Sequence, residues 1–494
     1  MTATCLMVLG TTSGAGKSWL TTALCRHYAR QGLKVAPFKA QNMSNNARVV
    51  AGPGGRWGEI GSAQYFQALA ACATPEVRMN PVLLKPEADT RSQVVLLGEV
   101  DRELTDLPWR GRSERVWPHV TQALDTLRAE HDVVVIEGAG SPAEINLHAS
   151  DIVNMRVARH ASARCLLVTD IDRGGAFAHL YGTWALLPPE ERALIQGFVL
   201  NKFRGDASLL APAPQMLREL TGVPTVATLP MRWHHGLPEE DGVFDDRTNA
   251  PGTVRLTVAV VAYPRISNLD EFQPLKNVPG VRLVWARSPA DVANADWIVL
   301  PGSKHTGSDL AWLRQQGLDR AVADHAAQGR AVLGICGGLQ MLGEALVDTH
   351  GIEPLADGNA PGLGLLPLVT AFEPHKTVQP TRARFSGVQG PWAALDGVTV
   401  GGYEIHHGQT APHPAMVAAG ALARPVLGAG QTIGWQNAAG NVLGLYLHGL
   451  FEDPAALAAL FGHAAPTLEH VFDGLADFVR DHFEPGVLDR LIRP

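Results

Sequence analysis

A cysteine at the end of an apolar run is the residue whose surroundings most clearly suggest chemistry. Residues 331–340 read AVLGICGGLQ, which predicts a buried strand, a tight turn at Cys336 and the start of a helix. Glycines on both sides of the cysteine allow the unusual backbone dihedral angles that such a turn needs. The pattern is typical of a nucleophile elbow, in which the next N–H groups, beginning with Gly337, point at one spot. A helix N-terminus favours the reactive thiolate, so we expect a nucleophile rather than a structural thiol.

A cysteine nucleophile needs a base, and His448 is the candidate. Residues 442–447 predict a strand, and His448 follows it directly, as Cys336 follows its own strand. The carboxyl ends of strands in an open α/β sheet form the functional edge, so we expect the two side chains there. The alternative is a histidine with a purely structural role. We interpret His406 and His407 as sheet or loop residues, because no third metal ligand is spaced with them.

A second group of chemical residues lies near the N-terminus, where a glycine-rich loop ends in Lys-Ser. The loop, residues 10–18, lies between a predicted strand and a predicted helix, as phosphate-binding loops do. Its backbone N–H groups, including those of Gly14 and Gly16, would surround the phosphates of a nucleotide. Lys17 would reach the outer phosphate oxygens, and Ser18 would hold Mg²⁺.

Glu137 is the carboxylate that we expect beside this loop. It follows the apolar strand predicted at 132–136, and Gly-Ala-Gly-Ser-Pro comes after it. An acid at the end of such a strand is placed to hold Mg²⁺ or its water, together with Ser18. The alternative, a helix cap, fits poorly with the glycines and the proline that follow.

Two further strand ends carry charged or polar groups. The strand predicted at 165–169 is followed by Asp170, Asp172 and Arg173, which suit a site that handles charge transfer. Either aspartate could instead cap the following helix, and the sequence leaves both alternatives open. The next predicted strand is followed by Asn201, which is placed to read a nucleotide base.

The elements that must position these groups alternate between strands and helices, which predicts parallel, doubly wound sheets. In the first half we expect strands at 5–9, 33–38, 94–97, 132–136, 165–169, 197–200 and 224–229, and helices at 18–30, 60–73 and 113–130. In the second half we expect strands at 254–262, 282–286, 297–300, 331–335, 401–407 and 442–447, and an amphipathic helix at 468–483.

Length and composition predict two domains. A chain of 494 residues is too long for one ordinary core. Residues 233–252 are rich in Pro, Gly, Asp and Glu and have little periodicity, as in a domain tail with a linker. We therefore expect an α/β protein with one doubly wound domain at 1–240, a linker at 241–253 and a second doubly wound domain at 254–494.

Composition also argues against several classes of partner. The formal net charge of −7 gives no basic surface for nucleic acid or for an anionic membrane. Five scattered cysteines have neither zinc nor disulfide spacing, which favours a reducing cytoplasm. No basic segment precedes the short apolar run at the N-terminus, so we expect no signal peptide. No apolar stretch reaches about 18 residues, so we expect no membrane-spanning helix.

The two groups of residues together predict one reaction. ATP would convert a carboxylate into an acyl phosphate at the glycine-rich loop. The cysteine and histidine motifs resemble those of glutamine amidotransferases, which implies that ammonia is released at the cysteine; this ammonia would then displace the phosphate and give an amide. Ammonia is a nucleophile only while it is unprotonated, which favours a path between the sites that is shielded from bulk water.

The cysteine and histidine motifs resemble those of the class I glutamine amidotransferases, in their cobalamin-biosynthesis branch. The motifs are Gly334-x-Cys336-x-Gly338-x-Gln340 and Tyr446-x-His448-Gly449. The resemblance implies that Cys336 attacks the side-chain amide of glutamine, that a glutamyl thioester forms, and that His448 moves the proton. It also implies that Gly302, in Pro-Gly-Ser-Lys at 301–304, supplies an oxyanion-hole N–H, and that Gly337 and Gln340 belong to the glutamine and oxyanion site.

The third member of the triad stays open at this point. Many relatives carry an acid two positions after the histidine, where this chain has Leu450. Glu452 is a weak substitute.

The glycine-rich loop resembles that of dethiobiotin-synthetase-like ATPases, and essentially the whole chain resembles the glutamine-hydrolysing amidoligases of cobalamin biosynthesis. The motifs that carry this likeness are KAQNM at 39–43, MNP at 79–81, EGAGSP at 137–142, DIDRGG at 170–175, NKFRGD at 201–206, PRISN at 264–268 and GYEIH at 402–406. The likeness implies amidation of the b, d, e and g side-chain carboxylates of a corrinoid, adenosylcobyrinic acid a,c-diamide, with ATP and glutamine.

Two alternatives remain. The nearer one is the same chemistry on other corrin carboxylates, as in cobyrinic acid a,c-diamide synthases. The other, from a different class, is a P-loop ATPase switch whose amidotransferase-like domain is inactive. Release of glutamate from glutamine separates the two classes, because the switch would release none.

Overall fold

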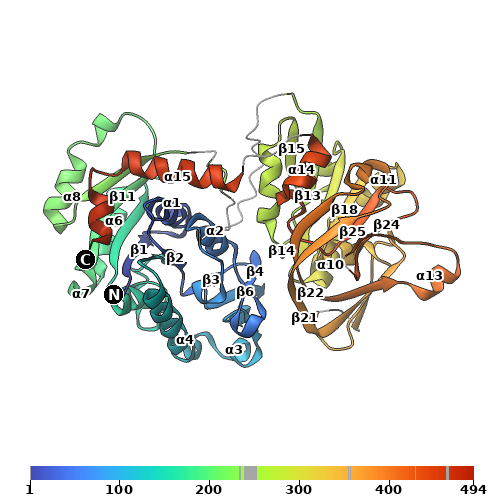
Figure 1. The fold of residues 1–494 in the computed structure, drawn as a ribbon, viewed down its shortest axis with the longest axis horizontal. Helices are drawn as coiled ribbons and strands as arrows, with labels where there is room; N and C mark the ends of the chain where they lie inside the picture. Colours follow the sequence, from blue (N-terminus) through green and yellow to red (C-terminus); the bar gives the residue numbers. More distant parts are fainter. Residues whose placement is uncertain are drawn as a thin grey trace.

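The computed structural model describes residues 2–88, 90–232, 235–237, 253–353, 355, 358–428, 430–462 and 467–493. These residues form two α/β bodies side by side (Figure 1). Apart from residue 253, the linker expected at 241–253 lies outside the described residues. Within the described residues, no helix is both long enough and apolar enough to cross a membrane.

The first body is built on a six-stranded sheet in which every neighbouring pair is parallel, in the order β12-β11-β10-β1-β9-β2. Its strands are β1 (Thr4–Gly10), β2 (Val35–Phe38), β9 (Val133–Glu137), β10 (Arg164–Asp170), β11 (Ile195–Phe203) and β12 (Thr225–Pro230). Their burial on both faces explains the continuous Val, Leu and Ile runs in the sequence. The carboxyl end of β1 lies between those of β9 and β10, where such sheets bind ligands.

Helices cover both faces of this sheet, as expected for a doubly wound fold. They are α1 (Lys17–Ala29), α2 (Ser62–Ala70), α3 (Arg102–Asp106), α4 (Trp109–Glu130), α5 (Met155–Ala161), α6 (Ala176–Leu186), α7 (Pro189–Arg192) and α8 (Ala213–Thr221). Alternate residues of β1 enter different cores: Met7 joins one cluster with residues of α4, and Leu6 joins another with residues of α1.

A small β layer extends the first body toward the second (Figure 1). It contains a four-stranded sheet of β3 (Gln41–Met43), β6 (Val82–Ala88), β7 (Arg91–Leu96) and β8 (Glu99–Asp101), and a hairpin of β4 (Ala47–Ala51) and β5 (Trp57–Gly61). The helix expected at 60–73 therefore begins two residues later than predicted, because Ile60 and Gly61 pair with Arg48 and Ala47 of β4.

The second body has an eleven-stranded sheet, with β22 paired to β21 beside the path β15-β13-β16-β18-β25-β24-β23-β21-β19-β20. The five strands from β15 to β25 are parallel, and the sheet then continues through antiparallel neighbours except for the parallel pair of β21 and β19. The strands are β13 (Leu256–Val261), β15 (Val281–Ala286), β16 (Trp297–Leu300), β18 (Ala331–Ile335), β19 (Ala345–Val347), β20 (Asn359–Pro361), β21 (Leu368–Phe385), β22 (Thr399–Pro412), β23 (Arg424–Gly428), β24 (Thr432–Gln436) and β25 (Val442–Leu445).

Short elements and helices complete the second body. They are β14 (Ile266–Ser267), β17 (Gly302–Ser303), the 3₁₀ segments η6 (Leu269–Asn277) and η9 (Leu450–Glu452), and the helices α9 (Pro289–Val292), α10 (Thr306–Gln315), α11 (Leu318–Ala327), α12 (Gly337–Leu342), α13 (Pro414–Ala418) and α14 (Pro454–Phe461).

The C-terminal helices α15 (Leu468–His482) and α16 (Val487–Ile492) return to the first body. Figure 1 shows α15 beside α1. Phe472 and Val479 of α15 share a buried cluster with Leu20 and Leu24 of α1. Our expected second domain, 254–494, thus includes helices that pack against the first sheet. The amphipathic pattern marked the helix correctly, but a helix pattern does not say which core it covers.

Candidate active sites

Cys336 occupies the turn between β18 and α12, as the elbow pattern predicts. Its φ of 51° and ψ of −106° lie in a region that a non-glycine residue seldom adopts, so the surrounding structure must hold the turn in place. The turn is tight: a Cβ added at Gly338 would overlap the carbonyl oxygen of Leu300. The cysteine backbone N–H donates to the carbonyl of Leu445 on β25 at 2.8 Å, which fixes the elbow to the strand that leads to His448.

His448 lies against this cysteine and is held by a carboxylate from another part of the chain. Glu271, at the start of η6, accepts from His448 Nδ1 at 3.0 Å and from the Gly449 N–H at 2.8 Å. Both side chains are buried. Burial lowers the pKa of His448, but Glu271 and a hydrogen-bonded Cys336 outweigh it and raise the pKa to about 10. Such a protonated imidazole stabilises a neighbouring thiolate.

The third acid is therefore Glu271, which our sequence reasoning did not identify. Glu452, the substitute that we considered, instead forms a two-point ion pair with Arg48 at 2.6 Å. The sequence did carry a weak signal, since an Asp-Glu pair follows the PRISN motif after a single leucine. Nothing local linked that pair to His448, which lies 177 positions further along the chain.

Replacing Glu271 with glutamine tests this assignment. Because glutamine keeps the size but loses the charge that stabilises the imidazolium, we expect the kcat for glutamine hydrolysis to fall about 10²-fold. Initial rates of glutamate release measure the effect. An Asp396→Asn variant provides a comparison at a carboxylate of the same body that accepts from the Gly387 and Val388 N–H groups and not from the imidazole. A rate for Glu271→Gln equal to that of the parent chain would contradict the assignment.

The expected oxyanion segment lies beside the same groups. A Cβ added at Gly302 would come within 2.8 Å of His448 Cε1, and one added at Gly337 would come within 2.8 Å of the Ser303 backbone nitrogen. The structure thus brings the β17 segment, the elbow and the histidine together. Gln340, by contrast, is engaged within the fold: its Oε1 accepts from Thr306 Oγ1 at 2.9 Å.

The glycine-rich loop connects β1 to α1, as predicted. Gly16 has a φ of +99°, and a Cβ at this position would overlap the amide of Asn201. Lys17 lies over the loop, where its Nζ donates to the carbonyls of Thr12 at 2.9 Å and Ser13 at 3.3 Å. Its ammonium group is therefore at the centre of the loop, close to where a bound phosphate would sit.

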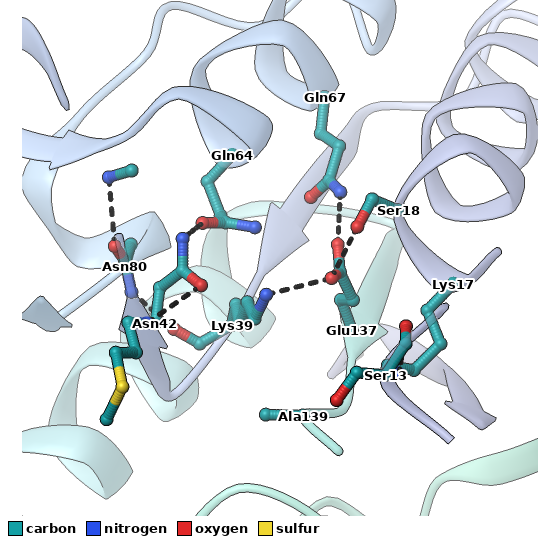
Figure 2. Close-up of polar contacts among 12 residues, drawn as sticks. Ser13, Lys17, Ser18, Lys39, Asn42, Gln64, Gln67, Asn80, Glu137 and Ala139 are labelled. Carbon is teal, nitrogen blue, oxygen red and sulfur yellow. Dashed lines mark hydrogen bonds and ion pairs between the residues drawn. The ribbon is translucent and has the colours of Figure 1, made fainter. Parts of the chain in front are cut away.

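Glu137 lies beside this loop, at the end of β9 (Figure 2). It accepts from Ser18 Oγ at 2.8 Å, from Lys39 Nζ at 2.9 Å and from Gln67 Nε2 at 2.5 Å. Burial raises the pKa of Glu137, but Lys39 and the hydrogen bonds from Gln67 and Ser18 outweigh it and hold the pKa below its usual value. A charged carboxylate next to the loop serine follows, whereas no helix begins at Glu137 for it to cap.

Lys39 also connects this carboxylate to the small β layer. Asn80 donates to the Lys39 carbonyl at 3.0 Å and accepts from the Gly61 N–H at 3.0 Å (Figure 2). Asn42 and Gln64 form a further amide pair at 3.2 Å in the same region. The KAQNM and MNP segments, which resembled the amidoligases, thus hydrogen-bond to one another and to their neighbours beside Glu137.

Asp170 and Asp172 form ion pairs instead of capping a helix. Asp170 pairs with Lys202 Nζ at 3.1 Å and with Arg173 Nε at 3.4 Å, and Asp172 pairs with Arg204. The residue that caps α6 is a glycine, without a side-chain hydrogen bond. Since the Lys202 Nζ also donates to the Gly14 carbonyl at 2.9 Å, the Asp170 group is tied to the phosphate-binding loop.

Arg173 and Asn201 also lie at this loop. A Cβ at Gly14 would come within 3.5 Å of an Arg173 guanidinium nitrogen, so this exposed side chain lies over the loop. Asn201 is buried and its amide donates to the Ala15 carbonyl at 2.8 Å. We expected this amide to read a nucleotide base; its contact in the structure is with the loop backbone, where it holds the turn at Gly16.

The two family models that match the chain fall one on each body. Residues 6–241 match the CobQ/CobB/MinD/ParA nucleotide binding domain. Residues 257–456 match the CobB/CobQ-like glutamine amidotransferase domain. Fold and sites thus define the chain as a nucleotide-binding α/β domain joined to a glutamine amidotransferase domain.

Relatives that align over the full length narrow this class further. The chain is 75% identical over 500 residues to the cobyric acid synthase of Acidovorax ebreus (strain TPSY), with 99% of both chains covered. It is 76% identical over 492 residues to that of Variovorax paradoxus (strain S110), with 100% of both covered. The chain belongs to the cobyric acid synthase family. This confirms the family and the α/β fold class that the motifs indicated.

Proposed function

We propose that this chain amidates the b, d, e and g side-chain carboxylates of adenosylcobyrinic acid a,c-diamide, using ATP, Mg²⁺ and glutamine. The observation that supports the proposal is the presence in one chain of two groups of residues, each suited to one half of the reaction. One is a phosphate-binding loop with Glu137 beside it, and the other is the Cys336–His448–Glu271 group. Relatives named cobyric acid synthase support the choice of substrate.

In the glutamine site, Cys336 attacks the amide carbon of glutamine. Backbone N–H groups of the segments at Gly302 and Gly337 stabilise the oxygen on which negative charge develops. His448 gives its proton to the departing nitrogen, and Glu271 holds the imidazole in the orientation for this transfer. Water then hydrolyses the glutamyl thioester, which releases glutamate and restores the thiol.

In the nucleotide site, the loop N–H groups and Lys17 hold the phosphates of ATP while a substrate carboxylate attacks the terminal phosphorus. Arg173, which lies over the loop and pairs with Asp170, balances the negative charge that develops on the transferred phosphoryl group. The resulting acyl phosphate reacts with ammonia: the new C–N bond forms as the C–O bond to phosphate breaks. This step completes the amide and frees inorganic phosphate.

The residues around Glu137 fit Mg²⁺, which prefers oxygen ligands. Ser18 and Glu137 would hold the ion, and it would neutralise phosphate charge when bound. Gln67 Oε1 is buried and has no hydrogen-bond partner in the described structure, so this oxygen could accept a hydrogen bond from a water bound to the ion. The described residues contain no group of three His, Cys, Asp or Glu side chains that could bind a metal. Mg²⁺ usually takes its remaining ligands from phosphate and water.

A large cavity, whose lining includes none of the site residues named above, is roomy enough for a bulky substrate. It measures about 1050 Å³ and is lined by both bodies, including Trp57 and Arg91 of the first and His350 and Lys376 of the second. Pockets for drug-sized ligands range from about 300 to 1,000 Å³, so this one is large enough for more than a small metabolite. All five cysteines are free thiols, which supports a reducing cytoplasm as the compartment.

Product analysis tests the proposed function. The purified chain is incubated with ATP, Mg²⁺, amide-labelled glutamine and a panel of corrinoid acids, and the products are resolved by mass spectrometry. With the a,c-diamide as substrate, we expect the product to carry label in new amides at the b, d, e and g positions. Label only at the a and c positions of an unamidated corrinoid would indicate the alternative diamide synthase, and absence of glutamate release would indicate the ATPase switch.

A further inference from the structure

Arg48 of the first body reaches into the second body next to the glutamine site. It lies on β4, and only 2% of its side chain is exposed. Its guanidinium pairs with Asp270 and makes two contacts of 2.6 Å with Glu452, while its Nε donates to Ser62 Oγ at 3.3 Å. Buried charges persist only where they are well paired, so these carboxylates require the arginine from the other body.

Both partners of Arg48 adjoin the proposed triad in the chain. Asp270 directly precedes Glu271, and Glu452 closes the turn whose Gly449 N–H also donates to Glu271. Without the guanidinium, the buried carboxylates of Asp270 and Glu271 and the partly exposed carboxylate of Glu452 would lie close together with one positive partner fewer. Like charges at short distance favour protonation or displacement of one of them, and either change would disturb Glu271.

Tyr403 provides a second connection from Arg48 to the triad. Its ring stacks on His448 with centroids 5.4 Å apart and planes 17° apart. The Arg48 guanidinium lies 5.2 Å from the centre of the same ring, within the range of a cation–π contact. The tyrosine ring therefore touches both the arginine and the imidazole.

The chain segment that leads to Glu271 is also fixed by the first body. Asn268, in the left-handed conformation with φ 57°, donates to the Ala47 carbonyl at 2.8 Å and to Tyr403 Oη at 2.5 Å. The Leu269 N–H donates to Asn46 Oδ1 at 3.0 Å. Arg48 and the two residues before it, Asn46 and Ala47, thus all bind the start of η6, on which Glu271 lies.

We propose that Arg48 is a positioning residue for glutamine hydrolysis, which holds Glu271 and His448 in place through Asp270, Glu452 and Tyr403. The glutamine site is then complete only when the nucleotide-binding body is docked on it, so ammonia is produced only where the acyl phosphate can use it. The inference rests on the proposed function of the two sites and adds the residue that joins them.

The test compares two nitrogen sources in the full-length chain. Arg48→Met should lower the glutamine-dependent kcat of amide synthesis about 10²-fold, because displacement of catalytic groups by about 1 Å has effects of this size. Synthesis from an ammonium salt should stay within twofold of the parent chain, since it does not use Glu271 or His448. Arg48→Lys, which retains the charge, should recover part of the glutamine-dependent rate.

Arg26 offers a matched control. It is also a buried arginine that joins distant segments, pairing with Asp473 and Glu469 of α15, and no described contact connects it to the triad. Arg26→Met should leave the ratio of glutamine-dependent to ammonium-dependent rates unchanged, even where stability falls. Glu452→Gln, which keeps the Arg48–Asp270 pair, gives a milder variant that should lower the same ratio if Arg48→Met does not fold.

An unchanged ratio in Glu452→Gln, or in a folded Arg48→Met, would overturn the positioning role. This result differs from failure of the proposed function, in which the parent chain itself would form no corrinoid amide from either nitrogen source. A merely structural role for Arg48 predicts an equal loss with both sources.

Discussion

Replacing Cys336 with alanine should abolish amide synthesis from glutamine and leave synthesis from ammonium salts intact. The thiol sulfur is the atom that bonds to the glutamine carbon. Its backbone has the unusual dihedral angles of the turn between β18 and α12. Removing the nucleophile of a triad eliminates nearly all of its rate, so we expect a loss of about 10⁴-fold or more. Corrinoid amide formed per minute, measured with each nitrogen source, gives the result.

Two observations make the Cys336→Ala experiment specific. Cys165 is a buried free thiol on β10 of the first body, and burial raises its pKa far above the usual range. Cys165→Ala should therefore leave glutamine-dependent synthesis close to that of the parent chain. If Cys336→Ala lost synthesis from ammonium as well, the division into two separable sites would be untenable.

The parts of this molecule that the sequence predicts well are those in which neighbouring residues determine the structure. The apolar runs of β1, β9, β10 and β18 predicted buried parallel strands, because a strand covered on both faces has no polar alternation. The glycine-rich loop and the cysteine elbow were equally clear. In both, glycines mark close backbone approach, and the chemical residue stands at a fixed offset from them.

The parts that the sequence did not reveal depend on contacts between distant segments. Glu271 and His448 are joined only by folding of the second body, and Arg48 contacts Glu452 across 404 positions. Asn201 shows the same limitation in another form. Its place after a strand was predicted, but its bond to Ala15 across 186 positions, and hence its support of the loop, was not.

Lys17 should be essential with either source of nitrogen, in contrast to Cys336. Its ammonium group lies over the phosphate-binding loop, where its present partners are the carbonyls of Thr12, Ser13 and Gly140. Lys17→Ala removes the positive charge that balances the outer phosphates of ATP as the acyl phosphate forms. Losing one such preorganised electrostatic contact costs about 10³-fold in rate. Corrinoid amide formation and release of inorganic phosphate measure the loss.

A loss of synthesis in Lys17→Ala carries weight only if the chain still folds, and the second body provides that control. Glutamine hydrolysis depends on Cys336, His448 and Glu271, none of which contacts Lys17 in the described structure, so glutamate release should persist. Lys34→Ala removes a lysine outside the loop, after α1, and should leave both activities unchanged. Ammonium-driven synthesis that survives Lys17→Ala would remove the loop from the reaction, because nothing else in the proposed mechanism activates the carboxylate.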